Sequence, residues 1–259
     1  MSSEGGGLIS LRRPIVPLFS LTRATSYWGI PMMSREHRLR TMYKVQVTPP
    51  TKFENVHINK RGFVIGGGPS IKDIEKETLD KLEQEVTIGV NKAYRLIKPT
   101  YLVFSDQYFW KHFGHEVQKV DCIKIIPDNI ARGVRNDQLV RVRRSNSIRD
   151  VLPTSMNTIS FLNNSGVGAL RIAFLMGCNP IYLLGMDMGP DTSGETHFHN
   201  DYKHDPKRKT SPNRYQQFFT EFERTIKAME ERRVNVVSCS PISTLNSIIP
   251  YVPINEVLG

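Results

Sequence analysis

Short, continuously apolar runs alternate with stretches of helical periodicity from about residue 60 onward. The runs that read as buried strands are residues 62–66, 86–90, 101–104, 122–126, 181–184 and 234–237. Apolar residues recur at helical spacing over residues 72–84, 166–176 and 215–231. This alternation is typical of a mostly parallel sheet covered by helices on both faces. The pattern therefore predicts an α/β fold.

Two stretches interrupt the pattern. Residues 128–158 are polar, and we expect them to be irregular; they contain an arginine cluster, Arg141, Arg143 and Arg144. Residues 185–212 predict a long polar loop between a buried strand and the last long helix.

The first 57 residues lack sustained periodicity, and we expect them to form a basic, disordered arm ahead of a single domain at residues 58–259. Residues 1–50 hold seven Lys or Arg and two Glu, which gives them +5 of the formal net charge of +10. An Arg-rich, acid-poor beginning is also typical of a transit peptide, although no amphipathic helix is evident. A third interpretation places the natural start near Met42.

Composition narrows the class of protein. With 39% hydrophobic residues, the chain can bury a sizeable core, and no apolar run approaches the roughly 18 residues that a membrane span requires. We therefore expect a soluble protein without a membrane span. Cys122, Cys178 and Cys239 form neither a zinc motif nor a disulfide framework, which favours a cytoplasmic location. The positive charge favours polyanionic partners, such as nucleic acid or phosphorylated ligands.

The most informative segment is RGFVIGGGPS, residues 61–70, in which a buried strand runs into three glycines and a helix start. Glycines permit positive φ and close approach of a ligand to the backbone. A proline suits a first helical turn, and free amides at a helix N-terminus attract anions. We expect a nucleotide phosphate at Gly66, Gly67, Gly68, Pro69 and Ser70. The segment is neither a Walker loop nor a complete G-x-G-x-x-G motif.

Ligands of parallel α/β sheets bind beyond the carboxyl ends of the strands. The polar residues that follow the predicted strands are Asn91, Ser105, Asp106 and Asp187, and Asn164, Ser165 and Gly166 stand at a helix start. Asn164 or Ser165 would equally suit a helix N-cap. Together these residues predict one polar rim.

Taken in order, these motifs resemble a known family. GGGPS after a strand, Asn91, Ser105-Asp106 and NNSGVGALRIAFLMGCNPIYLLGMDMG resemble the bacterial sialyltransferase-like glycosyltransferases. They also resemble the related 6-hydroxymethylpterin diphosphokinase MptE-like proteins, many of which occur in phage genomes. The resemblance covers about residues 60–250, and VNVVSCSPIS fits the family's closing strand and turn. We expect a phage member acting in the host cytoplasm.

The resemblance implies a Rossmann-like three-layer α/β/α sandwich and a nucleotide-activated sugar donor, with no metal or other cofactor. It places the donor phosphate at the Gly66–Ser70 loop, the nucleotide at Asn91, and the donor sugar and nucleotide along Asn164, Ser165 and Gly166. Asp187 would close the site, and Tyr202 or Tyr215 would donate to the leaving phosphate. The family's loop usually reads Gly-Asn-Gly-Pro-Ser, so Gly67 departs from it. The family's catalytic His before the last long helix is also absent, because Ser211-Pro212-Asn213 stands there.

The loop DMGPDTSGETHFHNDYKHD, residues 187–205, offers replacements for that base: His197, His199 and His204. A histidine near neutral pH can deprotonate an acceptor hydroxyl. We favour His199, because Asn200 or Asp201 could orient its ring. The same residues could bind a metal through the His-x-His pair, or the loop could be catalytically inert.

The leading functional hypothesis is a glycosyltransferase that moves a sugar from a nucleotide-activated donor to an acceptor, which the basic charge would allow to be nucleic acid, such as a modified base in phage DNA. A second hypothesis is pyrophosphoryl transfer from ATP to a pterin, which would need Mg²⁺ on carboxylates such as Asp106, Asp187 and Asp191. A third is a non-catalytic phage binding protein that retains the fold. We also expect a homo-oligomer.

Overall fold

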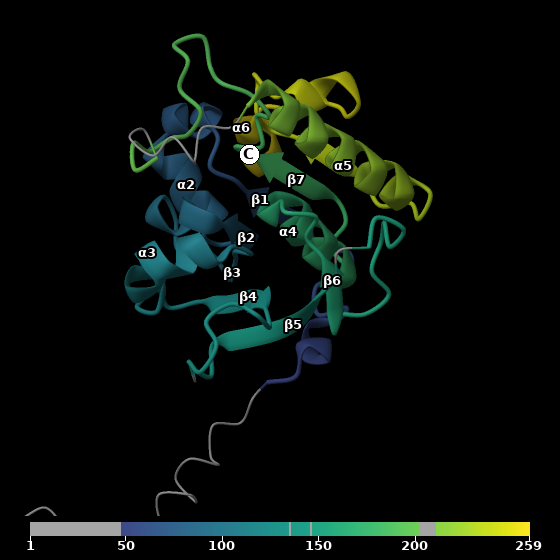
Figure 1. The fold of residues 1–259 in the computed structure, drawn as a ribbon. Helices are drawn as coiled ribbons and strands as arrows, with labels where there is room; N and C mark the ends of the chain where they lie inside the picture. Colours follow the sequence, from purple (N-terminus) through teal and green to yellow (C-terminus); the bar gives the residue numbers. More distant parts are fainter. Residues whose placement is uncertain (1–47, 135, 146, 203–210) are drawn as a thin grey trace, which may run out of the picture. The chain divides into compact units, whose positions relative to one another are not determined.

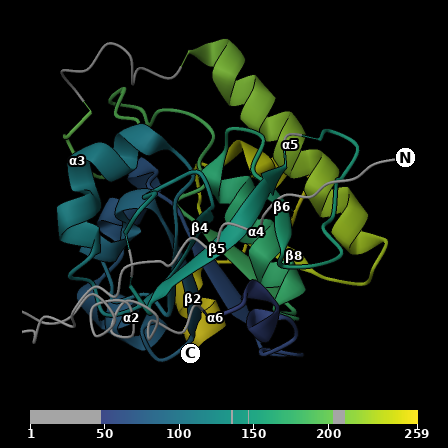
Figure 2. The same ribbon diagram turned by 60° about the horizontal axis from the view of Figure 1, so that its bottom comes forward.

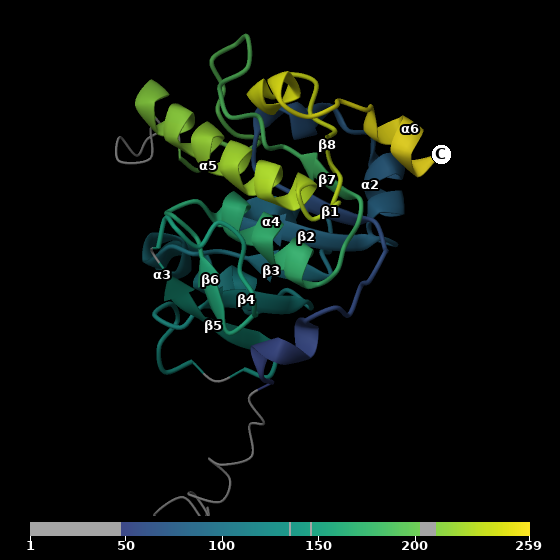
Figure 3. The same cartoon turned by 90° about the vertical axis from the view of Figure 1, so that its right-hand side faces the viewer.

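Eight parallel strands form one open sheet in the order β6-β5-β4-β3-β2-β1-β7-β8. The computed structural model describes residues 48–259, except 135, 146 and 203–210. The strands are β1 (Gly62–Ile65), β2 (Val86–Val90), β3 (Tyr101–Val103), β4 (Ile123–Pro127), β5 (Leu139–Ser145), β6 (Thr158–Ser160), β7 (Ile181–Leu184) and β8 (Val236–Ser238). Figure 3 shows them following one another from β8 to β5.

The strand order reverses beside β1. Successive strands from β1 to β6 extend the sheet in one direction, and the chain then returns to form β7 on the other side of β1. In the register, Val64 of β1 lies between Ile88 of β2 and Leu183 of β7. Such a reversal leaves a crevice at the carboxyl ends of the two strands.

Helices cover both faces of the sheet (Figure 1). The α-helices are α2 (Lys76–Leu82), α3 (Gln107–Val117), α4 (Ser165–Leu175), α5 (Pro212–Glu230) and α6 (Ile254–Leu258). The short 3₁₀ helices are η1 (Pro50–Phe53), η2 (Pro69–Asp73), η3 (Asn91–Arg95) and η5 (Thr244–Ser247). These elements confirm the predicted α/β/α sandwich.

Alternation along the strands assigns side chains to the two layers. Phe63 and Ile65 of β1 pack with Ile71 and Leu82 on the α2 face, whereas Val64 belongs to the larger core under α4 and α5. The α4 helix is apolar on almost every side because it lies between the sheet and α5, where both of its faces are buried.

The structure corrects the predicted helix at residues 72–84. A five-residue 3₁₀ helix, η2, comes first, the backbone is extended at Ile74 and Glu75, and α2 begins at Lys76. Hydrogen bonds from Ser70 to Asp187 tie the first turn to the end of β7, so its direction is set separately from that of α2.

The stretch at residues 128–158 is also not irregular throughout, since it contains all of β5 and the first residue of β6. Three arginines conceal the strand pattern of β5, in which Val140 and Val142 are buried and Arg143 is exposed. The Arg141 side chain donates to the carbonyl groups of the preceding turn, at Ile130, Ala131 and Val134. Figure 2 turns this edge of the sheet forward.

The described part of the N-terminal region packs on the sheet domain. Backbone amides of Asn55, His57 and Asn59 donate to carbonyl groups at residues 175–177, at 2.8–3.0 Å. The folded unit therefore begins before residue 58, earlier than the boundary that the sequence suggested, while residues 1–47 lie outside the described residues. None of the described helices has the length and apolar character to cross a bilayer.

Candidate functional site

A cavity of about 690 Å³ opens at the carboxyl ends of the central strands. Among the residues that the sequence singled out, its wall includes Gly66, Gly67, Gly68, Asn91, Ser105, Asp106, Asn164, Ser165, Gly166, Asp187, His197, His199, Tyr202 and Tyr215. Pro69 and Ser70 are not part of the wall, and His204 lies outside the described residues. The predicted polar rim is therefore one surface, with a volume within the range typical of small-molecule sites.

Two of the three glycines in the turn use their backbone amides within the protein. None of its three glycines has positive φ; that conformation occurs across from it at Gly185, with φ +61°. The amides of Gly66 and Gly68 donate to the carbonyl groups of Leu184 and Gly185, at 2.7 and 2.8 Å. These two amides are therefore engaged with β7 and the turn after it.

Close packing explains two of the glycines, and the cavity explains the third. A Cβ on Gly66 would stand 2.9 Å from the Met186 sulfur, and one on Gly68 would stand 2.8 Å from the Gly185 carbonyl oxygen and closer still to Asp187. A Cβ on Gly67 would meet only His197, at 3.6 Å. Gly67 is thus the glycine that leaves room for a ligand.

Asp187 links two of the turns that line the cavity. It is 3% exposed, and its carboxylate accepts hydrogen bonds from the amide and hydroxyl of Ser70, at 2.9 and 2.6 Å. Burial raises the pKa of Asp187, and the Ser70 hydrogen bonds oppose that rise. Asp187, in the wall, and Ser70, which is not part of it, therefore join the chain after β7 to the chain after β1.

Three helix N-termini meet at the cavity. Asp106 caps α3 by accepting from the Phe109 amide, Asn164 caps α4, and Ser211 caps α5. Asn164 therefore acts as a helix N-cap, because its Oδ1 accepts a hydrogen bond from the Gly166 amide at 2.9 Å. Helix N-termini carry partial positive charge, so their convergence favours an anionic ligand.

Two amide side chains in the wall keep unused hydrogen-bonding atoms. Asn164 is 9% exposed and its Nδ2 is buried, as is Oδ1 of Asn91, which has φ +51°. Neither atom has a hydrogen-bond partner among the described residues. Because buried polar atoms are normally satisfied, these atoms are the natural contacts for a bound molecule.

Arginines that the sequence did not assign to a site also line the cavity. Arg144 of β5 donates to the Ser105 carbonyl oxygen at 2.8 Å and to Asn163 Oδ1 at 2.9 Å, which turns its guanidinium toward the starts of α3 and α4. Arg214 lies in the first turn of α5. Val140, Val142 and Arg144 occupy every second position of the sequence. This alternation is the signal that could have placed Arg144 near the end of a strand.

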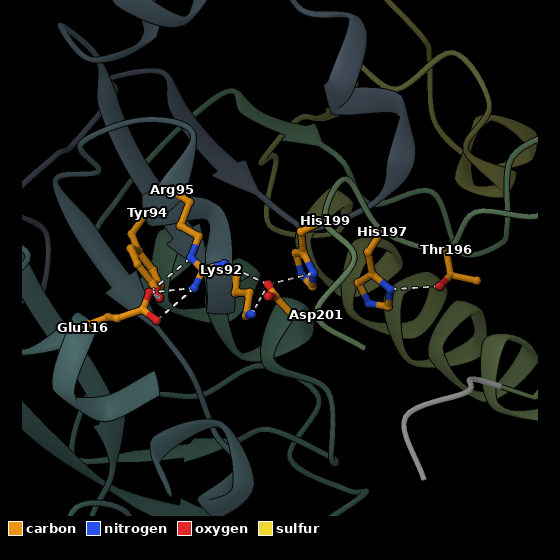
Figure 4. A network of polar contacts seen from close by, with 8 residues as sticks. All are labelled: Lys92, Tyr94, Arg95, Glu116, Thr196, His197, His199 and Asp201. Atoms are coloured by element: carbon orange, nitrogen blue, oxygen red, sulfur yellow. Dashed lines mark hydrogen bonds and ion pairs between the residues drawn. The ribbon is translucent and has the colours of Figure 1, made fainter. Parts of the chain in front are cut away.

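Of the three candidate histidines the structure describes two, His197 and His199, and they lie in different environments (Figure 4). His197 Nδ1 lies 2.9 Å from Thr196 Oγ1, and its ring stands over Gly67. Burial, together with the charges of His197 and Lys92, lowers the pKa of His199 to about 3. A group with such a pKa is a poor proton acceptor at neutral pH, which counts against the His199 preferred from the sequence and leaves His197, over Gly67, as the other described candidate.

The carboxylates named for Mg²⁺ do not converge. Asp106 caps α3, Asp187 is bound by Ser70, and Asp191 accepts hydrogen bonds from Ser193 and Glu195 within its own turn. In the described part of the chain, no three His, Cys, Asp or Glu side chains form a group able to hold a metal ion. The three carboxylates that the pterin diphosphokinase hypothesis names for Mg²⁺ thus have separate partners within the described residues.

Comparison with known proteins bears on the fold. No protein-family model and no curated protein sequence matches the chain. The MAf glycosyltransferase from Magnetospirillum magneticum AMB-1 is similar in structure, with a TM-score of 0.54 at 13% identity, over 80% of this chain and 38% of that protein. The Campylobacter jejuni sialyltransferase CstII, in complex with the substrate analogue CMP-3FNeuAc, gives a TM-score of 0.44 at 15% identity, over 75% of this chain and 86% of that one. The chain thus shares its fold with the MAf protein while spanning little more than a third of that protein's length.

Proposed function

We propose that this protein is a glycosyltransferase that transfers a sugar from a nucleotide-activated donor to an acceptor hydroxyl group. The observation that carries the proposal is the convergence of three helix N-termini, Arg144 and Arg214 on one cavity that also contains His197. The helix N-termini and the two arginines suit a phosphate, and a histidine within the same cavity suits proton transfer.

The donor phosphate is placed at the starts of α3 and α4, beside Arg144. Charge-assisted hydrogen bonds from a guanidinium to phosphate are among the strongest in proteins. The buried Nδ2 of Asn164 adds a donor there, and Oδ1 of Asn91 offers an acceptor for a hydroxyl or amino group of the nucleotide or sugar. This assignment moves the phosphate from the glycine turn to the helix starts.

In the transfer step, His197 accepts the proton of the acceptor hydroxyl as its oxygen bonds to the anomeric carbon of the donor sugar. The bond between that carbon and the phosphate oxygen breaks, and the electron pair leaves with the nucleotide. The helix N-termini and Arg144 stabilise the charge that develops on the leaving phosphate. Tyr202 and Tyr215, which both line the cavity, are proposed donors to it.

The shared fold with a protein named as a glycosyltransferase supports the proposal. The formal charge of +10 makes nucleic acid an acceptor class worth testing beside oligosaccharides.

Thermal unfolding with a ligand panel tests the function. CMP-, UDP- and GDP-linked sugars are compared with ATP plus Mg²⁺ and a pterin. A ligand at 100 times its Kd stabilises the folded state by about 2.7 kcal/mol, which would raise Tm by several degrees. We expect a rise with one class of nucleotide sugar, followed by acceptor-dependent release of its nucleotide. A rise with ATP and Mg²⁺ alone would support the pyrophosphoryl hypothesis, and no rise with any ligand would support a non-catalytic protein.

A further inference from the structure

The charged group of Lys92 is buried within the domain. The residue follows Asn91 directly, at the carboxyl end of β2, and is 1% exposed. Its ammonium group forms an ion pair with Asp201 and lies 3.5 Å from the centre of the Phe113 ring and 5.1 Å from that of Tyr202. Figure 4 shows Lys92 directed toward Asp201.

Asp201 is held from a second direction as well. Arg95 Nη1 donates to it at 2.8 Å, and the same guanidinium binds Glu116 of α3 at 2.7 Å. The chain leading to Asp201, residues 196–202, is called here the histidine segment. Its C-terminal end is therefore anchored to η3 and, through Arg95 and Glu116, to α3.

The other end of the histidine segment is anchored at the glycine turn, where the Phe198 amide donates to the Gly67 carbonyl oxygen at 3.1 Å. The Tyr202 ring is nearly perpendicular to both histidine rings, with centroid distances of 5.2 Å to His197 and 4.7 Å to His199. Both histidines thus lie close to the two anchors, and a shift of either anchor would move them.

Burying an ion pair is seldom the most stable solution. Lys92 is the buried partner, at 1% exposure, while the Asp201 side chain is 35% exposed. The cost of removing the lysine from water offsets much of the attraction, and an apolar side chain of similar volume can serve stability as well. What the pair supplies here is a connection between η3, where Asn91 lines the cavity, and the segment that carries His197.

We propose that Lys92 and Asp201 are positioning residues, whose ion pair holds the histidine segment over the cavity with His197 facing Gly67. The catalytic consequence rests on the proposed function of His197. The positional consequence does not, and it can be measured without a substrate.

Titration of His199 by NMR in Asp201→Asn tests the position directly. The charged groups around His199 are Asp201, which raises its pKa, and Lys92, Arg95 and His197, which lower it. If the segment stayed in place, losing the Asp201 charge would lower the His199 pKa further. If the segment is released, burial is relieved and the pKa moves toward its ordinary value of about 6.5. We expect the rise.

The matched control is Asp121→Asn. Asp121 forms an ion pair with Lys98 at 2.9 Å on the surface. The Lys98 side chain is 60% exposed and that of Asp121 is 75% exposed. The same chemical change there should leave the His199 titration as in the unaltered protein. A His199 that remains neutral down to pH 5 in Asp201→Asn, as in the unaltered protein, overturns the proposal.

A second variant covers the case in which an unpaired Lys92 prevents folding. Lys92→Met combined with Asp201→Asn removes both charges and keeps an unbranched chain beside Phe113 and Tyr202. We expect this double variant to fold and to show the same rise in the His199 pKa, and an unshifted titration in it would also overturn the proposal.

With a donor and acceptor identified, Asp201→Asn should lower kcat at least 10-fold with the donor KM little changed, and Asp201→Glu should recover part of the loss. Absence of transferase activity in the unaltered protein would refute the proposed function and leave the NMR result to decide the positioning role.

Discussion

His197 lies over Gly67, so that a Cβ at position 67 would stand 3.6 Å from the Cδ2 atom of its ring. The next residue in the segment, Phe198, donates its amide to the Gly67 carbonyl oxygen. The turn after β1 and the proposed base are therefore in direct contact. This relationship explains why the glycines of one turn should respond differently to the same substitution.

Gly67→Ala should fold normally, because its methyl group meets only His197 at an ordinary contact distance. We expect it to weaken nucleotide-sugar binding, since the methyl group enters the cavity. Gly68→Ala should instead destabilise the domain by about 1–3 kcal/mol, because its methyl group collides with Asp187 and the Gly185 carbonyl group. Urea unfolding and ligand titration of both variants check this contrast. Equal stability of the two would contradict the assigned packing.

His197→Ala should keep donor affinity and lose turnover. A positioned general base typically contributes about 10²–10⁴-fold, so the loss should fall in kcat and lie in that range. His199→Ala should lose less, because the low pKa of His199 makes it a poor base. Steady-state kinetics with varied donor measure both. A larger kcat loss in the His199 variant would return the role of base to that residue.

Arg144→Gln should weaken binding of the nucleotide portion of the donor. Loss of a charge-assisted hydrogen bond costs about 1.5–3 kcal/mol, which corresponds to roughly 10–150-fold in Kd. Arg143→Gln is the control, because Arg143 is the exposed neighbour on the same strand and does not line the cavity. Calorimetric titration with the free nucleotide reports the difference. Similar affinities for the two variants would place the phosphate elsewhere.

His199 should make stability depend on pH. Its folded pKa of about 3 lies below the ordinary value of 6.5, so the unfolded chain takes up a proton first as the pH falls. The stabilising contribution is complete above pH 6.5 and declines through the acidic range toward pH 3, by at most about 1.4 kcal/mol per pH unit. His199→Gln removes this contribution to the free energy of unfolding. Between pH 7 and 5, the unaltered protein should therefore lose more unfolding free energy than the variant does, as measured by urea unfolding.

The sequence predicted the sheet because its inner strands are buried on both faces and read as continuous apolar runs, such as Phe63–Ile65. It missed β5, where arginines occupy positions that bind backbone carbonyl groups rather than water. Strand pairing, which makes that placement possible, is not visible along the chain.

The cavity wall was largely predictable, because residues after parallel strands meet at one edge. The roles within it were not. Whether Gly68 contacts a ligand or Asp187, and whether His199 is open to water or buried beside Lys92, depends on segments more than 100 residues apart. Local patterns carry no information on such contacts.

The hydrogen bonds that support the cavity through Asp187 and Ser70 also have a consequence for the order in which the protein folds. Asp187 binds Ser70 across 117 positions of the chain, and the Ser70 hydroxyl lies 3.1 Å from that of Ser240 across 170. Contacts of such long range close late and slow the folding of parallel sheets. During synthesis, the Ser240 contacts beneath the cavity therefore cannot form until the turn after β8 has been made. A chain shortened at its C-terminal end by only twenty residues would lose Ser240 and, with it, part of the support beneath the proposed donor.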